Sequence, residues 1–396
     1  LQRVVQVVAL AGQCVIHRQH AAKHPRPGKL ALIVRKQEAQ WINQPRPIEM
    51  RPVDGTSIFD GKPPAAREPE SQTWFRAKAP IGDDQHKGAP AHQPTRVGLA
   101  QRGQRSPELR AAGEVVALPT ETVYGLAAVA ANGAAVARIF AAKGRPSFNP
   151  LIVHVADAAQ AATLVEVNAT AAALMAAHWP GPLTLVLPLR PDAPIAGLVS
   201  AGLPTLAVRC PAHPVMQAAI AAVGPLAAPS ANASGKISAT HARHVLASLR
   251  GRIPLIVDGG PSQAGVESTI IGVNGDRVTL LRPGAMAAAP DWQATTGSSI
   301  TAPGQLASHY APEQPVRLGA LTAAAHEFHI GFGAVRGDLS LSPAGDTIEA
   351  AANLFEALHV AQASGRAAIA VAPVPMAGLG VAINDRLTRA AAERPA

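Results

Sequence analysis

Four short polar motifs contain the residues whose types and spacing could do chemistry. The first two are LPTETVYGLA at 118–127 and KGRPSFNPLIVHV at 143–155. The third is APSANASGKISAT at 228–240, and the fourth pairs GVESTIIGV at 265–273 with LLRPGAM at 280–286. Each motif lies at the end of an apolar run, where α/β proteins place their sites. Cations, hydroxyls and a glycine-rich loop at such ends are suited to an anionic ligand.

The second motif supplies two cations. Lys143 and Arg145 stand two residues apart beside Gly144, so both can reach phosphate oxygens. Asn149 can hydrogen-bond a nucleotide, and His154 falls on the strand that follows. The alternative for this stretch alone is a solvated cationic turn and a core histidine.

The other motifs also have two interpretations each. Thr120 and Thr122 offer hydroxyls near a glycine turn, or they belong to a purely structural turn. The loop at 228–240 can present N–H groups to an anion before a helix, or it is a Ser/Gly linker. It lacks the glycine-lysine spacing of a P-loop. Arg282, before Pro-Gly, ends a strand and can reach a shared site, or it is a surface arginine at a hairpin end.

The elements that must position these residues alternate between strands and helices. Apolar spacing predicts a helix that begins at Ser238, which would serve as its N-cap. Strands are predicted at 114–118, 151–155, 183–189, 205–208, 226–228, 255–257, 268–273 and 278–281, and helices at 134–142, 169–178, 215–222 and 238–249. A second set is a strand-like run at 315–321, a helix at 347–363, a strand at 367–371 and a helix at 383–392.

Charge divides the chain. Residues 1–105 contain 17 Lys and Arg against eight Asp and Glu, whereas residues 106–396 contain 18 of each. The basic excess of the whole chain therefore lies in its first quarter, which is dense in Pro, Gln, His and Arg. We expect a basic, disordered extension there, either upstream sequence translated from a mis-set start or an RNA-binding arm.

The remainder is expected to be an α/β protein. It comprises a catalytic domain at 106–288 with an open, twisted mixed sheet and flanking helices, a linker or lid at 289–313, and a small Rossmann-like domain at 314–396. The two cysteines, Cys14 and Cys210, suggest neither a metal site nor a disulfide framework. No run approaches a membrane span, and a cytoplasmic location is the default expectation.

Taken in this order, the four motifs resemble the YrdC-like family, in the two-domain branch that makes threonylcarbamoyl-AMP. The resemblance runs from about residue 109 to the end. It includes GQLASHYAP at 304–312 and GLGVAINDRLTRAA at 378–391. It implies a nucleotidyltransferase that uses L-threonine, bicarbonate and ATP and releases pyrophosphate. A partner transferase would then modify an adenosine beside the tRNA anticodon.

The resemblance also assigns roles to residues. Those implied to hold threonine are Thr122, His154, Arg209, Ser230 and Ser268, with Arg209 paired to its carboxylate. Those implied to contact the nucleotide are Arg145, Asn149, Thr205, Asn232, Thr240, Arg282 and Tyr310, and the catalytic cations are Lys143, Arg145 and Arg282. Tyr310 would fold back over the site from the linker. Mg²⁺ would bridge ATP oxygens with few protein ligands, and no protein metal site is implied.

Two other functions compete with the synthase. A YrdC-like domain can bind double-stranded RNA or ribosomal precursors through a basic concave surface, but residues 106–396 have no net charge. Carbamoyl transfer in hydrogenase maturation would require a cysteine cluster that this sequence lacks.

Overall fold

The computed structural model describes residues 3–10, 13–20, 48–52, 73–77, 113–294, 302 and 308–393. Side-chain environments are described from residue 113 onward. Residues 2–102 form one compact unit, and residues 103–396 form the other.

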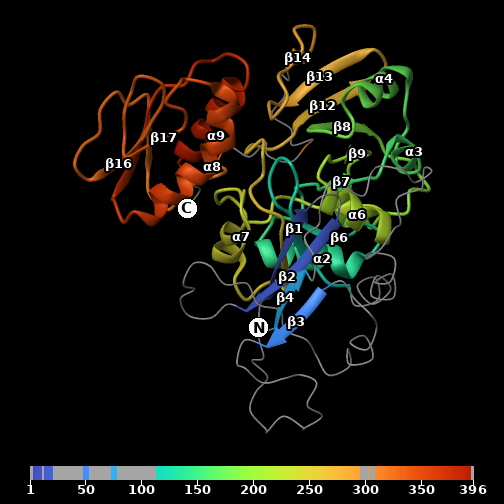
Figure 1. Cartoon of the computed structure of the whole chain (residues 1–396). Helices are drawn as coiled ribbons and strands as arrows, with labels where there is room; N and C mark the ends of the chain where they lie inside the picture. Colours follow the sequence, from blue (N-terminus) through green and yellow to red (C-terminus); the bar gives the residue numbers. More distant parts are fainter. Residues whose placement is uncertain are drawn as a thin grey trace, which may run out of the picture. The chain divides into compact units, whose positions relative to one another are not determined.

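A mixed sheet runs through the catalytic domain (Figure 1). Its strand order is β14-β13-β12-β8-β9-β7-β10-β6-β5-β11. The strands are β5 (Val116–Leu118), β6 (Gly125–Val129), β7 (Ile152–His154), β8 (Leu183–Pro188), β9 (Thr205–Arg209), β10 (Leu226–Ala227), β11 (Leu255–Asp258), β12 (Thr269–Asn274), β13 (Arg277–Arg282) and β14 (Gln293–Ala294). Parallel pairs such as β7 with β9 alternate with antiparallel ones such as β8 with β9. The predicted α/β class with a mixed sheet is confirmed.

Helices connect these strands, and polar side chains fix where several of them begin. The helices are α2 (Gly133–Lys143), α3 (Ala158–Ala162), α4 (Ala169–His178), α5 (Gly197–Ser200), α6 (Pro214–Val223) and α7 (Ala242–Leu249). Asn132, Asp157 and Asn168 each cap a helix by accepting a backbone N–H. Alanine is frequent on the buried faces, so helices and strands pack closely.

The C-terminal domain is a parallel sheet with two helices. Its strand order is β15-β18-β16-β17, with β15 (Val316–Leu318), β16 (Glu327–Gly331), β17 (Leu339–Ser340) and β18 (Ala368–Val371). The helices are α8 (Thr347–Ala363) and α9 (Gly380–Ala391). Val123 and Val266 of the catalytic domain belong to the same buried cluster as Phe355 of α8. The two domains therefore share a buried hydrophobic cluster.

A glycine permits this close approach. Gly265 has a φ of +70°, and a Cβ at this position would lie 2.3 Å from the carbonyl oxygen of Ala351 in α8. Any larger residue would push α8 away from the loop that leads into Glu267.

The structure corrects some predicted elements. The helix at 238–249 begins at Ala242, because Ser238 is fully buried and its hydroxyl donates to Glu267 instead of capping a helix. The last helix begins at Gly380 instead of Ile383. β6 begins inside the motif expected to be a turn, and β16 and β17 were not predicted.

The described residues of the 2–102 unit form two antiparallel strand pairs. β1 (Arg3–Leu10) pairs with β2 (Gln13–His20), and β3 (Ile48–Pro52) pairs with β4 (Thr73–Ala77). No strand was predicted here, yet valine-rich stretches such as that of β1 favour extended backbone. Most of the predicted linker positions from 295 to 307 lie outside the described residues.

Deleting residues 1–105 is expected to leave catalytic activity nearly unchanged. The reason is the change of composition and charge at Ser106, close to the division between the two compact units. The check is the rate of pyrophosphate release by the truncated and the full-length protein. Loss of folding or of activity on truncation would show that the extension is part of the enzyme.

Candidate active site

The end of α2 delivers two cations to one place. Gly144 adopts the left-handed conformation with a φ of 61°, and its N–H closes the helix on Ala141. Lys143, the last helical residue, is only 2% exposed. Its Nζ donates to the carbonyl oxygens of Ser230 and Asn232. Burial and the nearby Arg145 hold the pKa of Lys143 well below its usual value. The solvated-turn alternative is therefore wrong for Lys143.

Arg145 is held by the chain that follows it. Its Nη2 donates to Asn149 Oδ1 at 2.7 Å and to the carbonyl oxygen of Pro150 at 2.8 Å. Burial lowers the pKa of Arg145 to about 10, so the guanidinium stays charged at neutral pH. These partners are neutral oxygens, and the positive charge remains available to an anionic ligand.

β7 and β9 place His154 opposite Arg209 in parallel register. Arg209 Nη1 donates to Thr122 Oγ1 at 2.8 Å, and its Nη2 forms an ion pair with Glu121 at 2.5 Å. Burial raises the pKa of Glu121, but Arg209 outweighs that effect and the net shift is downward. Burial, with Arg209 beside it, lowers the pKa of His154 to about 3. The imidazole is therefore neutral, and its Nδ1 is buried without a hydrogen-bond partner.

β12 and β13 bring Ser268 and Arg282 together. Arg282 Nη2 donates to the carbonyl oxygen of Ser268 at 2.8 Å, and the Ser268 hydroxyl lies 2.8 Å from Thr184 Oγ1. Arg282 is 4% exposed, so the alternative of a surface arginine at a hairpin end is wrong.

The loop at 228–240 closes another side. Ser230 forms a bridge with Gly125, and Asn232 is buried with an unpartnered Oδ1. Thr240 is 1% exposed, and its peptide N–H lies 3.3 Å from His244 Nδ1. The linker alternative is thus wrong for this stretch, which is packed into the domain.

One pocket gathers most of the predicted residues. Those that line it are Thr122, Arg145, His154, Arg209, Ser230, Ser268, Arg282 and Tyr310. Lys143 and Asn149 contact lining residues without being part of the lining. Thr205 lies at the opposite end of β9 from Arg209, and neither it, Asn232 nor Thr240 lines the pocket among the described residues. Their assignment to the nucleotide stays a prediction.

Comparison with known proteins extends over most of the chain. A family model described as telomere recombination matches residues 108–284, and one described as threonylcarbamoyl-AMP synthase, C-terminal domain, matches residues 277–392. The threonylcarbamoyl-AMP synthase of Bacillus subtilis (strain 168) is 41% identical over 317 residues, which cover 71% of this chain and 90% of the relative. The chain belongs to the threonylcarbamoyl-AMP synthase family.

Proteins of Pyrococcus abyssi are similar to this chain over a comparable length. The synthase of Pyrococcus abyssi is 40% identical over 314 residues, covering 71% of this chain and 92% of the relative. The crystal structure of P. abyssi Sua5 complexed with L-threonine superposes with a TM-score of 0.68 at 36% identity, over 75% of this chain and 95% of that one. A variant of the same protein, with two neighbouring residues, His and Tyr, changed to Ala, gives a TM-score of 0.67 at 35% identity, over 75% of this chain and 94% of that one.

In this member of the synthase family, the C-terminal domain contacts a residue that lines the pocket. Arg386 of α9 is fully buried, and its Nε lies 3.0 Å from Glu267 Oε2. Burial raises the pKa of Glu267, but Arg386 and Arg282 outweigh that effect, so the carboxyl pKa lies below its ordinary value. The Tyr310 ring packs at a tilt against the rings of His309 and Phe355, and its hydroxyl is buried without a partner.

Sequence reasoning missed Glu267, His309 and Arg386 as site residues. Glu267 and His309 line the pocket, and burial lowers the pKa of His309 to about 3. Arg386 falls inside the C-terminal motif of the family, which was the one available signal. Its pairing with a residue 119 positions away could not be read from spacing.

Proposed function

We propose that this protein is an L-threonylcarbamoyladenylate synthase, a nucleotidyltransferase that makes threonylcarbamoyl-AMP and pyrophosphate from L-threonine, bicarbonate and ATP. The product would serve threonylcarbamoyladenosine modification of tRNA, through a separate transferase. The observation that carries the proposal is the pocket, which is lined by Arg145 from the turn after α2, by Arg209 and Arg282 from the ends of β9 and β13, and by several hydroxyl side chains. The names and matched lengths of its relatives support the same reaction.

The proposed reaction joins the substrates directly to one another. It therefore needs residues that position them and offset their charge more than it needs a covalent nucleophile. The threonine amino group combines with bicarbonate to give a carbamate and water. A carbamate oxygen then attacks the α-phosphorus of ATP, and the bond to pyrophosphate breaks. All three substrates carry negative charge, so fixed cations and N–H groups offset the repulsion between them. In this proposal Arg209, Thr122 and Ser268 hold threonine, while Lys143, Arg145 and Arg282 hold the phosphates.

Mg²⁺ belongs to the proposal as a partner of ATP. Among the described lining residues the one carboxylate is Glu267, and its two oxygens accept from Ser238 and Arg386. The ion would therefore rest on phosphate oxygens and water, where it neutralises charge on ATP.

Pyrophosphate release is expected to require L-threonine and bicarbonate together. The reason is that the pocket supplies cations for ATP and a separate hydroxyl and arginine set for threonine. The check is a pyrophosphate assay on the full-length protein with each substrate omitted in turn, and with serine in place of threonine. Equal release with serine, or with no amino acid, would contradict the threonine assignment.

The cellular location of the protein is supported by fewer observations than its reaction. Among the residues described, no helix combines the length and apolar character needed to cross a bilayer. A cytoplasmic location is part of the proposal, since ATP and tRNA are its substrates and targets.

A further inference from the structure

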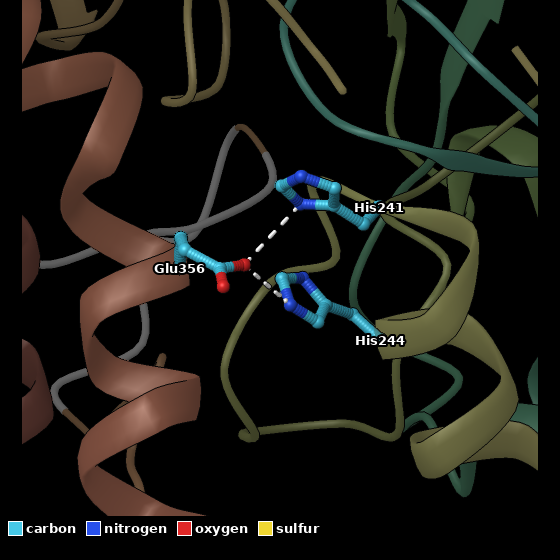
Figure 2. Close-up of side chains that lie close together, drawn as sticks. All are labelled: His241, His244 and Glu356. Atoms are coloured by element: carbon cyan, nitrogen blue, oxygen red, sulfur yellow. Dashed lines mark ion pairs between the residues drawn. The ribbon is translucent and has the colours of Figure 1, made fainter. Parts of the chain in front are cut away.

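A second cluster of ligand-type side chains lies outside the pocket, where α7 meets α8 (Figure 2). His241 precedes α7, His244 lies in its first turn, and Glu356 reaches toward both from α8. Glu356 Oε2 is 2.9 Å from His244 Nε2 and 3.4 Å from His241 Nδ1. All three ligand atoms lie within 4.8 Å of one another. Zinc bonds of about 2.0–2.2 Å place tetrahedral ligand atoms roughly 3.3–3.6 Å apart, so binding needs side-chain shifts of at most about an ångström from this arrangement.

Only one of the two carboxylate oxygens of Glu356 has a charged partner among the described residues. Arg243 forms an ion pair with Oε1 of Glu356. Oε2 is buried and accepts no well-aligned hydrogen bond, even though two imidazole nitrogens lie close to it. A buried carboxylate oxygen without a hydrogen bond is costly. A cation between it and the two nitrogens would satisfy all three atoms.

A metal ligand needs a free lone pair on the nitrogen that faces the ion. Thr240 Oγ1 lies 3.4 Å from His244 Nδ1 and can accept a hydrogen bond from an N–H there, which leaves a lone pair on Nε2. The peptide N–H of Thr240 faces the same nitrogen at 3.3 Å, so metal binding exchanges that contact for the one to the hydroxyl.

A further histidine fixes the orientation of the ligands. The ring of His359 stacks on that of His244, with centroids 3.8 Å apart and an interplanar angle of 20°. His359 Nε2 is held by the carbonyl oxygen of Ser238 at 3.0 Å. Outer contacts of this kind orient the ligands at metal sites and tune their affinity.

We propose that His241, His244 and Glu356 form a divalent metal site, best suited to Zn²⁺, that joins the catalytic domain to the C-terminal domain. Two imidazoles and a carboxylate are a ligand set that zinc accepts, with water as the fourth ligand. Mg²⁺ and Ca²⁺ prefer oxygen ligands throughout and would bind poorly here. This ion is separate from the Mg²⁺ proposed to accompany ATP.

The site also lies next to a residue with a predicted role. Thr240 Oγ1 is 3.3 Å from His241 Nδ1 and 3.4 Å from His244 Nδ1, and Thr240 is predicted to contact the nucleotide. A bound ion would fix α7, and thereby this threonine, against α8. The binding itself does not depend on the proposed synthase activity and is tested without it.

The test measures zinc directly on the full-length, untagged protein. After removal of metal with a chelator, we expect titration with Zn²⁺ to show binding that Glu356→Gln and His241→Ala each weaken at least about tenfold. Both variants should fold, because glutamine is nearly isosteric and His241 makes no side-chain cap to α7. Saturating Zn²⁺ should raise the melting temperature of the unsubstituted protein by on the order of 5 °C. Co²⁺ should give the intense visible absorption of a tetrahedral site.

Two variants serve as controls. Arg243→Ala removes a positive charge beside the site but no ligand, so zinc affinity should stay the same or increase. His326→Ala removes an exposed histidine of the C-terminal domain and should change nothing. No zinc-dependent change in melting temperature, or zinc binding that both ligand variants retain undiminished, would overturn the proposal. The second result would place the ion elsewhere, for example on the histidines of residues 1–105.

Discussion

Replacing Arg145 or Arg282 with alanine is expected to lower kcat/KM by roughly 30-fold to several thousand-fold. In the proposed complex each arginine forms a buried, hydrogen-bonded charge pair with a phosphate of ATP. Truncating one partner of such a pair costs about 2–5 kcal/mol, and each 1.36 kcal/mol is a factor of ten in rate. Arg282 is almost fully buried and belongs at the upper end of this range, whereas Arg145 is half-buried and belongs lower. The measurement is steady-state pyrophosphate release at varied ATP concentration.

Arg277→Ala provides the matched control, because this exposed arginine begins the strand that Arg282 ends. Its rate should stay within twofold of the unsubstituted protein. Arg282→Lys should fall between the two, since lysine keeps the charge but loses the planar fork that binds two oxygens. A loss below threefold in both Arg145→Ala and Arg282→Ala would place the nucleotide elsewhere.

The residues that sequence reasoning found share a local signal. Lys143 and Arg145 flank a glycine at a helix end, and Arg282 precedes Pro-Gly, so spacing alone marked them as site candidates. Burial then distinguished them from surface cations, which no sequence pattern could do. Lys143 is 2% exposed because the loop at 228–240 folds over it and supplies two carbonyl oxygens.

Errors arose where distant contacts override local preference. Ser238 has the character of an N-cap, but Glu267 recruits its hydroxyl and the helix starts four residues later. β16 was missed because Glu327 and His329 give it a polar appearance. In the fold Glu327 pairs with Arg317 at 2.6 Å, and His329 Nε2 lies 3.2 Å from the carbonyl oxygen of Ala320. These partners lie nine or ten residues away and make the polar residues compatible with a buried strand.

The active-site pocket depends on one ion pair that no motif revealed. Arg386 brings a charge from α9 to Glu267, and its Nη1 also donates to the carbonyl oxygen of Pro283, next to Arg282. Its guanidinium lies 5.5 Å from the ring centre of Tyr310. One buried side chain of the C-terminal domain thus contacts both the Glu267 loop and the tyrosine that lines the pocket. We expect it to position these groups without touching substrate.

Arg386→Met is therefore expected to destabilise the protein strongly and to lower activity. Removing one partner of a buried ion pair costs about 3–5 kcal/mol, which corresponds to a fall in melting temperature on the order of 10 °C. Thermal unfolding and limited proteolysis of the C-terminal domain measure the effect. Arg389→Ala, one turn further along α9, removes an i,i+4 pair with Asp385 that is more exposed and should cost only about 0.5 kcal/mol or less.

The double variant Glu267→Gln with Arg386→Met separates the ion pair from simple packing. If the charges depend on each other, the double variant should be less destabilised than the sum of the two single variants, because neither charge is left buried alone.

The pH dependence of stability adds a second measure of the same ion pair. The folded pKa of Glu267 lies below its ordinary value, so its contribution is present above that ordinary value and disappears as the pH falls through the folded one. Arg386→Met should weaken this acid-dependent loss, since the arginine is the main opposite charge. Strictly additive single effects, together with an unchanged acid profile, would show that Arg386 acts by filling space and not by its charge.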